Sequence, residues 1–234
     1  MSALWGTIVN VLAVAVGGTV GLLLNKGIPE RITKALMIGV GLCVLYIGID
    51  GCLAGKQMLV TILSLAIGAV IGELLDLDAR LERLGQAVER KLTKSNGDTP
   101  TVAKAFVNAS LLFCVGTMTI VGSLQSGLTG NHETLYLKSV LDLISSIVFG
   151  ATLGWGVLLS CVTILMYQGG IALLAQVVAP YLNDVVVAEM TCVGSLLIVA
   201  LALNILNITK IKVANFLPAV FLPLLLCPLY ALIF

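Results

Sequence analysis

The sequence predicts an all-α fold, a polytopic transmembrane bundle of about eight glycine-rich helices. Of its residues, 59% are hydrophobic and only 11% are charged, and the mean hydropathy is +1.11. Soluble proteins have about 45–50% apolar and about 25% charged residues. Such an excess of apolar residues fits a chain whose outer surface faces lipid as well as its own core.

Eight apolar runs follow one another along the chain, and each is close to the length of about 20 residues that crosses a bilayer. The fifth and sixth come from one run, residues 139–182, in which Asp142 is the only charged residue. Because this run is about twice the required length, we divide it near Gly154-Trp155-Gly156. The predicted spans form one domain, residues 1–234, and cover residues 3–24, 32–53, 58–75, 105–124, 139–156, 158–182, 188–206 and 213–234.

The loop charges support eight spans. With this number, the first, third, fifth and seventh loops lie on one side and carry eleven Lys and Arg residues, whereas the other side carries only Lys56 and Lys138. Basic residues concentrate on the cytoplasmic side of membrane proteins. We therefore expect both termini to lie outside the cytoplasm.

Residues 77–94 predict an amphipathic helix at the cytoplasmic interface, since apolar residues recur at helical spacing among charged ones. A short soluble hairpin without lipid contact is the alternative. The apolar positions are Leu77, Leu81, Leu84, Val88 and Leu92.

Two spans carry small residues at four-residue spacing, which places each set on one helix face. Such faces let two helix backbones approach closely in lipid. Because the preceding spans also share glycine patterns, we expect a repeated helical hairpin, although glycine is common in any membrane helix. The sets are Ser64, Gly68 and Gly72 in the third span and Ser146, Gly150 and Gly154 in the fifth.

Two further spans contain residues that disturb helices. Pro218, Pro223 and Pro228 predict kinks in the eighth span, because proline lacks the backbone N–H of the helical hydrogen bond. Gln168-Gly169-Gly170 predicts a break in the sixth span. Broken helices expose backbone groups that bind ions and small solutes; the alternative for Gln168 is an interhelical hydrogen bond.

Asp142 is the strongest candidate for a functional side chain. An ionisable group inside a membrane span is costly and usually faces a bundle interior or a water-filled cavity. It could bind a proton, a cation or a substrate. The alternative is an ion pair with Lys138, one helical turn away, at the outer interface.

We expect a binding site for a small polar solute or ion among the fourth, fifth and sixth spans. Glycines there make room for a ligand, and hydroxyl and amide groups can bind it. An interhelical hydrogen bond is the alternative for Asn10. The predicted site comprises Asp142, Ser145, Ser146, Gly116, Thr117, Ser123, Gln125, Gln168, Gly169 and Asn10.

The sequence favours neither an enzyme nor a metalloprotein. It has one histidine, His132, and lacks zinc-protease, serine-hydrolase and P-loop motifs. The six cysteines fit small buried apolar residues. We expect no metal, no cofactor and no nucleic-acid partner. Membrane lipid surrounds the chain, and two copies are expected to pair as a homodimer.

Several segments resemble the bacterial YqgA/YdfK-like membrane proteins, a family catalogued as a domain of unknown function. The likeness covers essentially the whole chain, but Thr117 stands where the family pattern has proline. It implies a protein of the bacterial inner membrane that is often considered a transporter, without an established substrate. The segments are Phe113–Leu128, Leu137–Asp142, Tyr167-Gln-Gly, Gly6-Thr7 with Asn10, Gly72-Glu73 and Asn215 with Leu217-Pro218.

Together these observations favour a transporter or permease for a small polar solute or ion, with its site near Asp142. A passive channel and a non-transporting assembly or sensor protein are the alternatives. A transporter predicts a cavity that reaches Asp142.

Overall fold

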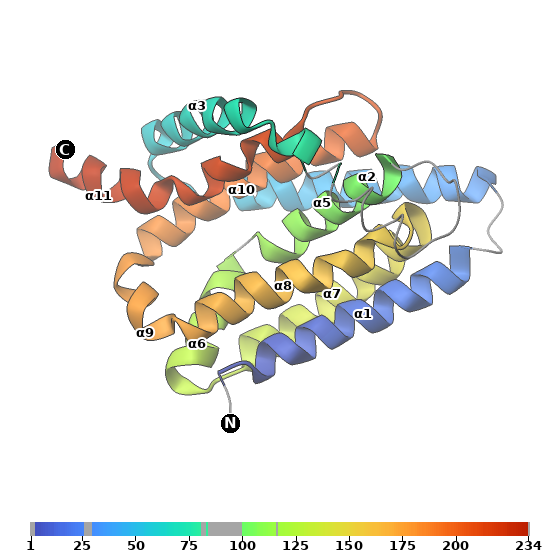
Figure 1. Ribbon diagram of the computed structural model, residues 1–234, viewed down its shortest axis with the longest axis horizontal. Helices are drawn as coiled ribbons and strands as arrows, with labels where there is room; N and C mark the ends of the chain where they lie inside the picture. The colour runs from blue at the N-terminus through green and yellow to red at the C-terminus, as the bar shows by residue number, and fades with distance from the viewer. Residues whose placement is uncertain (1–2, 26–29, 81–82, 84–99, 116, 234) are drawn as a thin grey trace.

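The computed structural model describes residues 3–25, 30–80, 83, 100–115 and 117–233, and this part of the chain is all-α, without strands (Figure 1). Its elements are α1 (Trp5–Asn25), α2 (Glu30–Cys52), α3 (Met58–Leu75), α5 (Pro100–Cys114), α6 (Thr117–Thr129), α7 (Glu133–Leu153), α8 (Gly156–Leu173), α9 (Ala175–Val178), η1 (Ala179–Tyr181), α10 (Asp184–Ile205), η2 (Val213–Phe221) and α11 (Pro223–Ile233).

The helices confirm a polytopic bundle. Five of them, α1, α3, α7, α8 and α10, are long and apolar enough to cross a membrane. The number rises to seven if each of the bent pairs α5–α6 and η2–α11 is one span. Within α2, residues Ile38–Cys52 form a shorter apolar helix. The count of eight spans stays a prediction, as does the position of the bilayer.

The long apolar run of residues 139–182 is two helices. α7 ends at Leu153 and α8 begins at Gly156. Gly154, between them, has a φ of 84°, a left-handed conformation that glycine adopts without steric cost. Because α7 begins at Glu133, six residues before the predicted span, Asp142 lies near the middle of the helix.

One predicted helix break is absent, and two pairs of helices are bent. The predicted span of residues 105–124 corresponds to the bent pair α5–α6, with an angle of 61° between its halves. The break predicted at Gln168-Gly169-Gly170 is wrong, because α8 continues to Leu173. In the proline-rich segment, η2 and α11 meet at 46°, and Pro223 begins α11.

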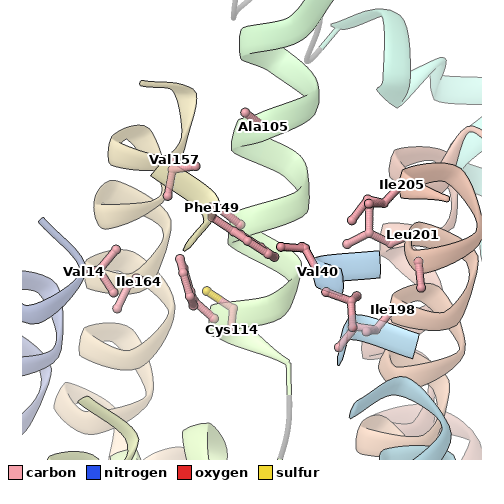
Figure 2. Packing of buried hydrophobic residues seen from close by; sticks show 14 residues of the cluster. Val14, Val40, Ala105, Cys114, Phe149, Val157, Ile164, Ile198, Leu201 and Ile205 are labelled. Carbon is pink, nitrogen blue, oxygen red and sulfur yellow. The ribbon is translucent and has the colours of Figure 1, made fainter. Parts of the chain in front are cut away.

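The bundle has two groups of helices joined through α5 (Figure 1). In one group, α1 contacts α7 and α8. In the other, α2 contacts α10, and α3 contacts η2. Apolar side chains from both groups meet around α5 (Figure 2). This core includes Val14, Phe113, Phe149, Ile164 and Leu201, all at most 2% exposed.

The outer surface of the bundle is also apolar. Large hydrophobic side chains are exposed on most of the helices, including Leu12 on α1, Tyr46 on α2, Leu74 on α3, Met166 on α8 and Leu232 on α11. Lipid is the solvent that such a surface requires. Charged and polar side chains inside the bundle are therefore surrounded by apolar groups, those of the core and those of the outer surface.

Both sets of small residues lie at close helix contacts. A Cβ atom at Gly68 of α3 would lie 2.5 Å from the Ala219 Cα of η2, and one at Gly72 would overlap the Asn215 carbonyl. On α7, a Cβ at Gly150 would overlap the Gly18 carbonyl of α1. The two sets thus contact different partners, and Gly154 ends α7 instead. The hairpin repeat stays a prediction.

The predicted amphipathic helix is only partly described. Residues 77–80 and 83 are helical, and the rest of residues 77–94 lies outside the described residues.

Candidate functional site

Asp142 forms an ion pair with Lys138 inside the bundle. The Lys138 Nζ lies 2.7 Å from Oδ2 and 2.9 Å from Oδ1 of Asp142. Each residue is 6% exposed. The ion pair that we considered as the alternative therefore exists, and it is buried inside the bundle. Burial of two charges is costly, and their attraction must be supplemented by further hydrogen bonds.

Asn10 of α1 supplies one such hydrogen bond. Its Nδ2 donates to Asp142 Oδ2 at 3.0 Å, and the residue is fully buried. This contact depends on the tight packing of α1 on α7. A Cβ at Gly6 would lie 2.7 Å from Leu135, and one at Gly17 would overlap Ser146. Small residues on α1 thus allow Asn10 to reach the carboxylate.

Three fully buried polar side chains, two on α1 and one on α8, have atoms without a hydrogen-bond partner in the described part of the chain. These atoms are Thr7 Oγ1, Asn10 Oδ1 and both polar atoms of Gln168. Gly169 of α8 faces α1, since a Cβ there would lie 3.3 Å from the Leu4 Cδ2 and 3.9 Å from the Thr7 Cγ2. We call Asp142, Lys138, Asn10, Thr7 and Gln168 the Asp142 cluster.

Buried polar groups almost always have partners. The free donors and acceptors of the Asp142 cluster therefore suit a bound water molecule, ion or polar solute, which needs several polar partners at once.

Other predicted site residues have different roles. The hydroxyls of Ser123 and Ser146 donate to carbonyls of their own helices, those of Thr119 and Leu143. Gln125 accepts a hydrogen bond from Thr134 across the α6–α7 turn. Ser145 is half-buried on α7. Gly116 and the side chain of Thr117 lie outside the described residues.

The sequence analysis missed a second buried carboxylate, Glu189 of α10. Oε1 accepts the backbone N–H groups of Lys56, at 2.6 Å, and Gln57, at 2.7 Å. Oε2 accepts the hydroxyl of Thr61 at 2.9 Å. Glu189 thus binds the start of α3, where helix N–H groups lack partners and the dipole favours negative charge. In the sequence, the position of Glu189 at the start of an apolar run was the signal that could have identified it.

At the opposite end of α3, Asn215 joins three segments. Its Nδ2 donates to the Glu73 carboxylate, and its Oδ1 accepts the N–H of Asp78 at 2.7 Å. The α3–η2 contact at Gly72 holds these groups together. These hydrogen bonds join the end of α3 to η2 and to the segment that follows α3.

Two cavities lie at this end of the bundle. The larger, of about 570 Å³, is bordered by α5, α10 and the loop before η2. The smaller, of about 440 Å³, lies between α3 and η2. Neither lining includes a residue of the Asp142 cluster, so neither is the cavity that a transporter predicts. Among the residues that the structure describes, no group of three His, Cys, Asp or Glu could hold a metal ion.

Comparison with known proteins assigns the chain to a family. Residues 5–228 match the family described as "Protein of unknown function (DUF554)". The chain belongs to this family. DUF554 relatives include the uncharacterized membrane protein YdfK of Bacillus subtilis, 33% identical over 94% of each chain. The uncharacterized protein YqgA of Escherichia coli is 30% identical over 93% of each chain. No solved structure matches.

The match confirms the resemblance drawn from the sequence, and the structure shows where those DUF554-like segments lie. Asn10 and Thr7, Lys138 with Asp142, and Gln168 with Gly169 meet in or beside the Asp142 cluster. Glu73 and Asn215 meet at the other end. Polar contacts thus join two pairs of these segments: Asn10 with Asp142, and Asn215 with Glu73.

Proposed function

We propose that this membrane protein is a transporter or permease for a small polar solute or ion, and that the Asp142 cluster is its binding site. The observation that carries the proposal is the buried Lys138–Asp142 pair, which Asn10 contacts, together with unpartnered polar atoms of Asn10 and Thr7 on α1 and of Gln168 on α8, the helix that packs on α1. A protein that needs only a stable bundle gains nothing from these groups, because apolar residues of similar volume pack at least as well.

The arrangement of groups suits a solute that carries both polar and charged atoms. Gln168 offers a donor and an acceptor, and Thr7 and Asn10 add oxygen atoms. Asp142 and Lys138 neutralise one another when the site is empty. A proton or cation that reaches Asp142 would release Lys138, so one carboxylate can couple solute binding to ion movement. Intramembrane ionisable residues serve such relays in transporters.

The bent helices support the same proposal. The α5–α6 pair bends beside α7 and α8, and η2–α11 bends beside α3. Interrupted helices are a common feature of transporters, in which they form substrate and ion sites. The inner-membrane location, the outward termini and a homodimer belong to this proposal.

The test is reconstitution of the full chain into liposomes that contain a pH-sensitive dye. Amino acids, sugars, small carboxylates, ammonium and alkali cations are added one at a time, with protein-free liposomes as the control. A coupled transporter moves protons only when its solute is present. Ion flux without any added solute would favour a channel. Absence of flux across the whole panel would contradict the proposal and favour an assembly protein.

A further inference from the structure

The larger cavity has a basic, polar lining. It lies where α7 and α10 end, and measures about 570 Å³, within the range of about 300–1,000 Å³ for small-molecule sites. Its lining includes Lys104, Lys210, Lys212 and one carboxylate, Asp78. Three lysines against one aspartate leave two positive charges around one space.

These lysines are not used in ion pairs. Each side chain is exposed, and none forms an ion pair with a carboxylate among the described residues. Their ammonium groups remain available to an anion in the cavity.

The loop that carries two of the lysines is held in place by Asn204. The Asn204 Oδ1 accepts the Thr209 hydroxyl at 2.8 Å and the Ile211 N–H at 2.9 Å, and its Nδ2 donates to the Ile211 carbonyl at 2.7 Å. Ile211 lies between Lys210 and Lys212. The two lysines are therefore fixed at the rim of the cavity by a pre-organised loop, which lowers the entropy cost of binding.

An uncharged donor completes the lining. Asn108 is one turn after Lys104 and so lies on the same face of α5. It is half-buried in the cavity wall, and its amide has no hydrogen bond to another described residue. A bound anion would receive charge from Lys104 and a neutral hydrogen bond from Asn108.

We propose that this cavity binds the phosphate group of an anionic ligand. Lysine ammonium groups act as point charges for phosphate oxygens, and the double positive charge matches a phosphate dianion. Loops on the cytoplasmic side of membrane proteins are rich in Lys and Arg, and this preference explains why lysines occur at the end of the bundle that we expect to face the cytoplasm. It does not explain why three of them border one cavity together with a free amide. The phosphate belongs to a soluble compound or to a phospholipid headgroup. The site is independent of transport at the Asp142 cluster.

The soluble arm of the test measures binding of inorganic phosphate to the purified full chain in an uncharged detergent, by thermal unfolding at constant ionic strength. The lipid arm measures retention of phosphatidylglycerol, with phosphatidylcholine as the comparison, by native mass spectrometry. Binding in the first arm indicates a soluble phosphate compound, and selective retention in the second alone indicates a headgroup. Absence of both overturns the proposal.

Variants distinguish a specific phosphate site in this cavity from non-specific attraction of an anion to surface lysines. The triple variant Lys104→Gln/Lys210→Gln/Lys212→Gln should weaken binding about tenfold or more, because charged hydrogen bonds are lost. Lys56→Gln, on an exposed lysine elsewhere, should bind as the wild type does. If the triple variant does not fold, Lys210→Gln alone should weaken binding severalfold. Asn108→Ala should also weaken it severalfold at unchanged charge. Unchanged binding by a folded lysine variant would overturn the proposal.

Discussion

At the scale of single residues, the Asp142 cluster combines a satisfied carboxylate with unsatisfied amides. Asp142 has three short contacts from Lys138 and Asn10, whereas Gln168 has none within the described chain. The first arrangement keeps a charge tolerable inside an apolar bundle. The second lowers stability unless a ligand or water supplies the missing bonds. The two halves of the cluster thus make different predictions.

Replacing Lys138 by Met should destabilise the protein strongly, because it leaves the Asp142 charge buried without its cation. Breaking one partner of a buried pair typically costs about 3–5 kcal/mol. The double variant Lys138→Met/Asp142→Leu should recover most of this loss. Thermal unfolding in detergent measures both, and lowering the pH should lessen the defect of Lys138→Met, since protonation removes the unpaired charge. Equal instability of the single and double variants would contradict a paired role.

Replacing Gln168 by Leu should separate stability from function. Leucine has a similar volume and removes two buried polar atoms without partners, so the free energy of unfolding should stay level or rise by about 1 kcal/mol. Solute-driven transport should nevertheless fall, because the ligand loses its amide contacts. A destabilised Gln168→Leu protein would show instead that this amide is bonded in the resting state.

At the scale of elements, small residues decide which helices pair. Gly68 and Gly72 hold α3 against η2, and Gly17, Gly21 and Gly150 hold α1 against α7. The approach is close enough that backbone carbonyls occupy the space of the missing side chains. Because α1 and α7 pair in this way, Asn10 reaches Asp142. The glycine contacts are therefore a condition of the site and not only of the fold.

Gly72→Ala should weaken the α3–η2 contact, because the added methyl group overlaps the Asn215 carbonyl. Overpacking in a dense core costs about 1–3 kcal/mol. Gly39→Ala is the matched control, since no atom lies within 4 Å of a Cβ there and alanine favours helix over glycine by about 1 kcal/mol. Thermal unfolding should show a loss for the first and no loss for the second. Equal behaviour of both variants would contradict the close contact.

The sequence predicted the elements better than their breaks. Hydrophobic runs and Gly154 located the division between α7 and α8. The α5–α6 bend was not located from the sequence, because both halves are apolar and an apolar run alone does not show where a helix bends. The opposite error occurred at Gln168-Gly169-Gly170, where α8 packs on α1 and continues as a helix. The two glycines therefore do not interrupt α8.

At the scale of the whole molecule, α1 begins and α11 ends at the same end of the bundle (Figure 1). The prediction of eight membrane spans requires such an arrangement, because an even number of spans returns the chain to the side on which it began. The basic cavity lies toward the other end, with Lys104, Lys210 and Lys212 around it. The distribution of charge along the bundle axis therefore predicts an orientation in the membrane.

Cysteine labelling checks this orientation in intact cells, with the six native cysteines replaced by serine or alanine. A cysteine at Asn131, in the exposed α6–α7 turn, should react with a membrane-impermeant maleimide added outside. A cysteine at Thr209, in the loop before η2, should react only after the cells are opened. The reverse pattern would contradict the expected placement of both termini outside the cytoplasm.

The site could be predicted only in part, since the missing contacts join distant parts of the chain. Asp142 was evident as the only charge in a long apolar run, and Asn10, Gln168 and Gly169 were named with it. That Lys138 is buried, and that Thr7 faces Gly169, follow from the packing of α1 on α7 and α8. Glu189 was missed because its partners, the N–H groups of Lys56 and Gln57, are backbone atoms that any sequence supplies.

The central claim is that Asp142 couples solute binding to ion movement, and transport by the Asp142→Asn variant tests it most directly. Asparagine keeps the shape and removes the charge, so the folded variant should lose solute-driven proton movement in liposomes. The matched variant Asp50→Asn, on an exposed carboxylate of α2, should retain it. Wild-type proton movement by a well-folded Asp142→Asn protein would contradict the account.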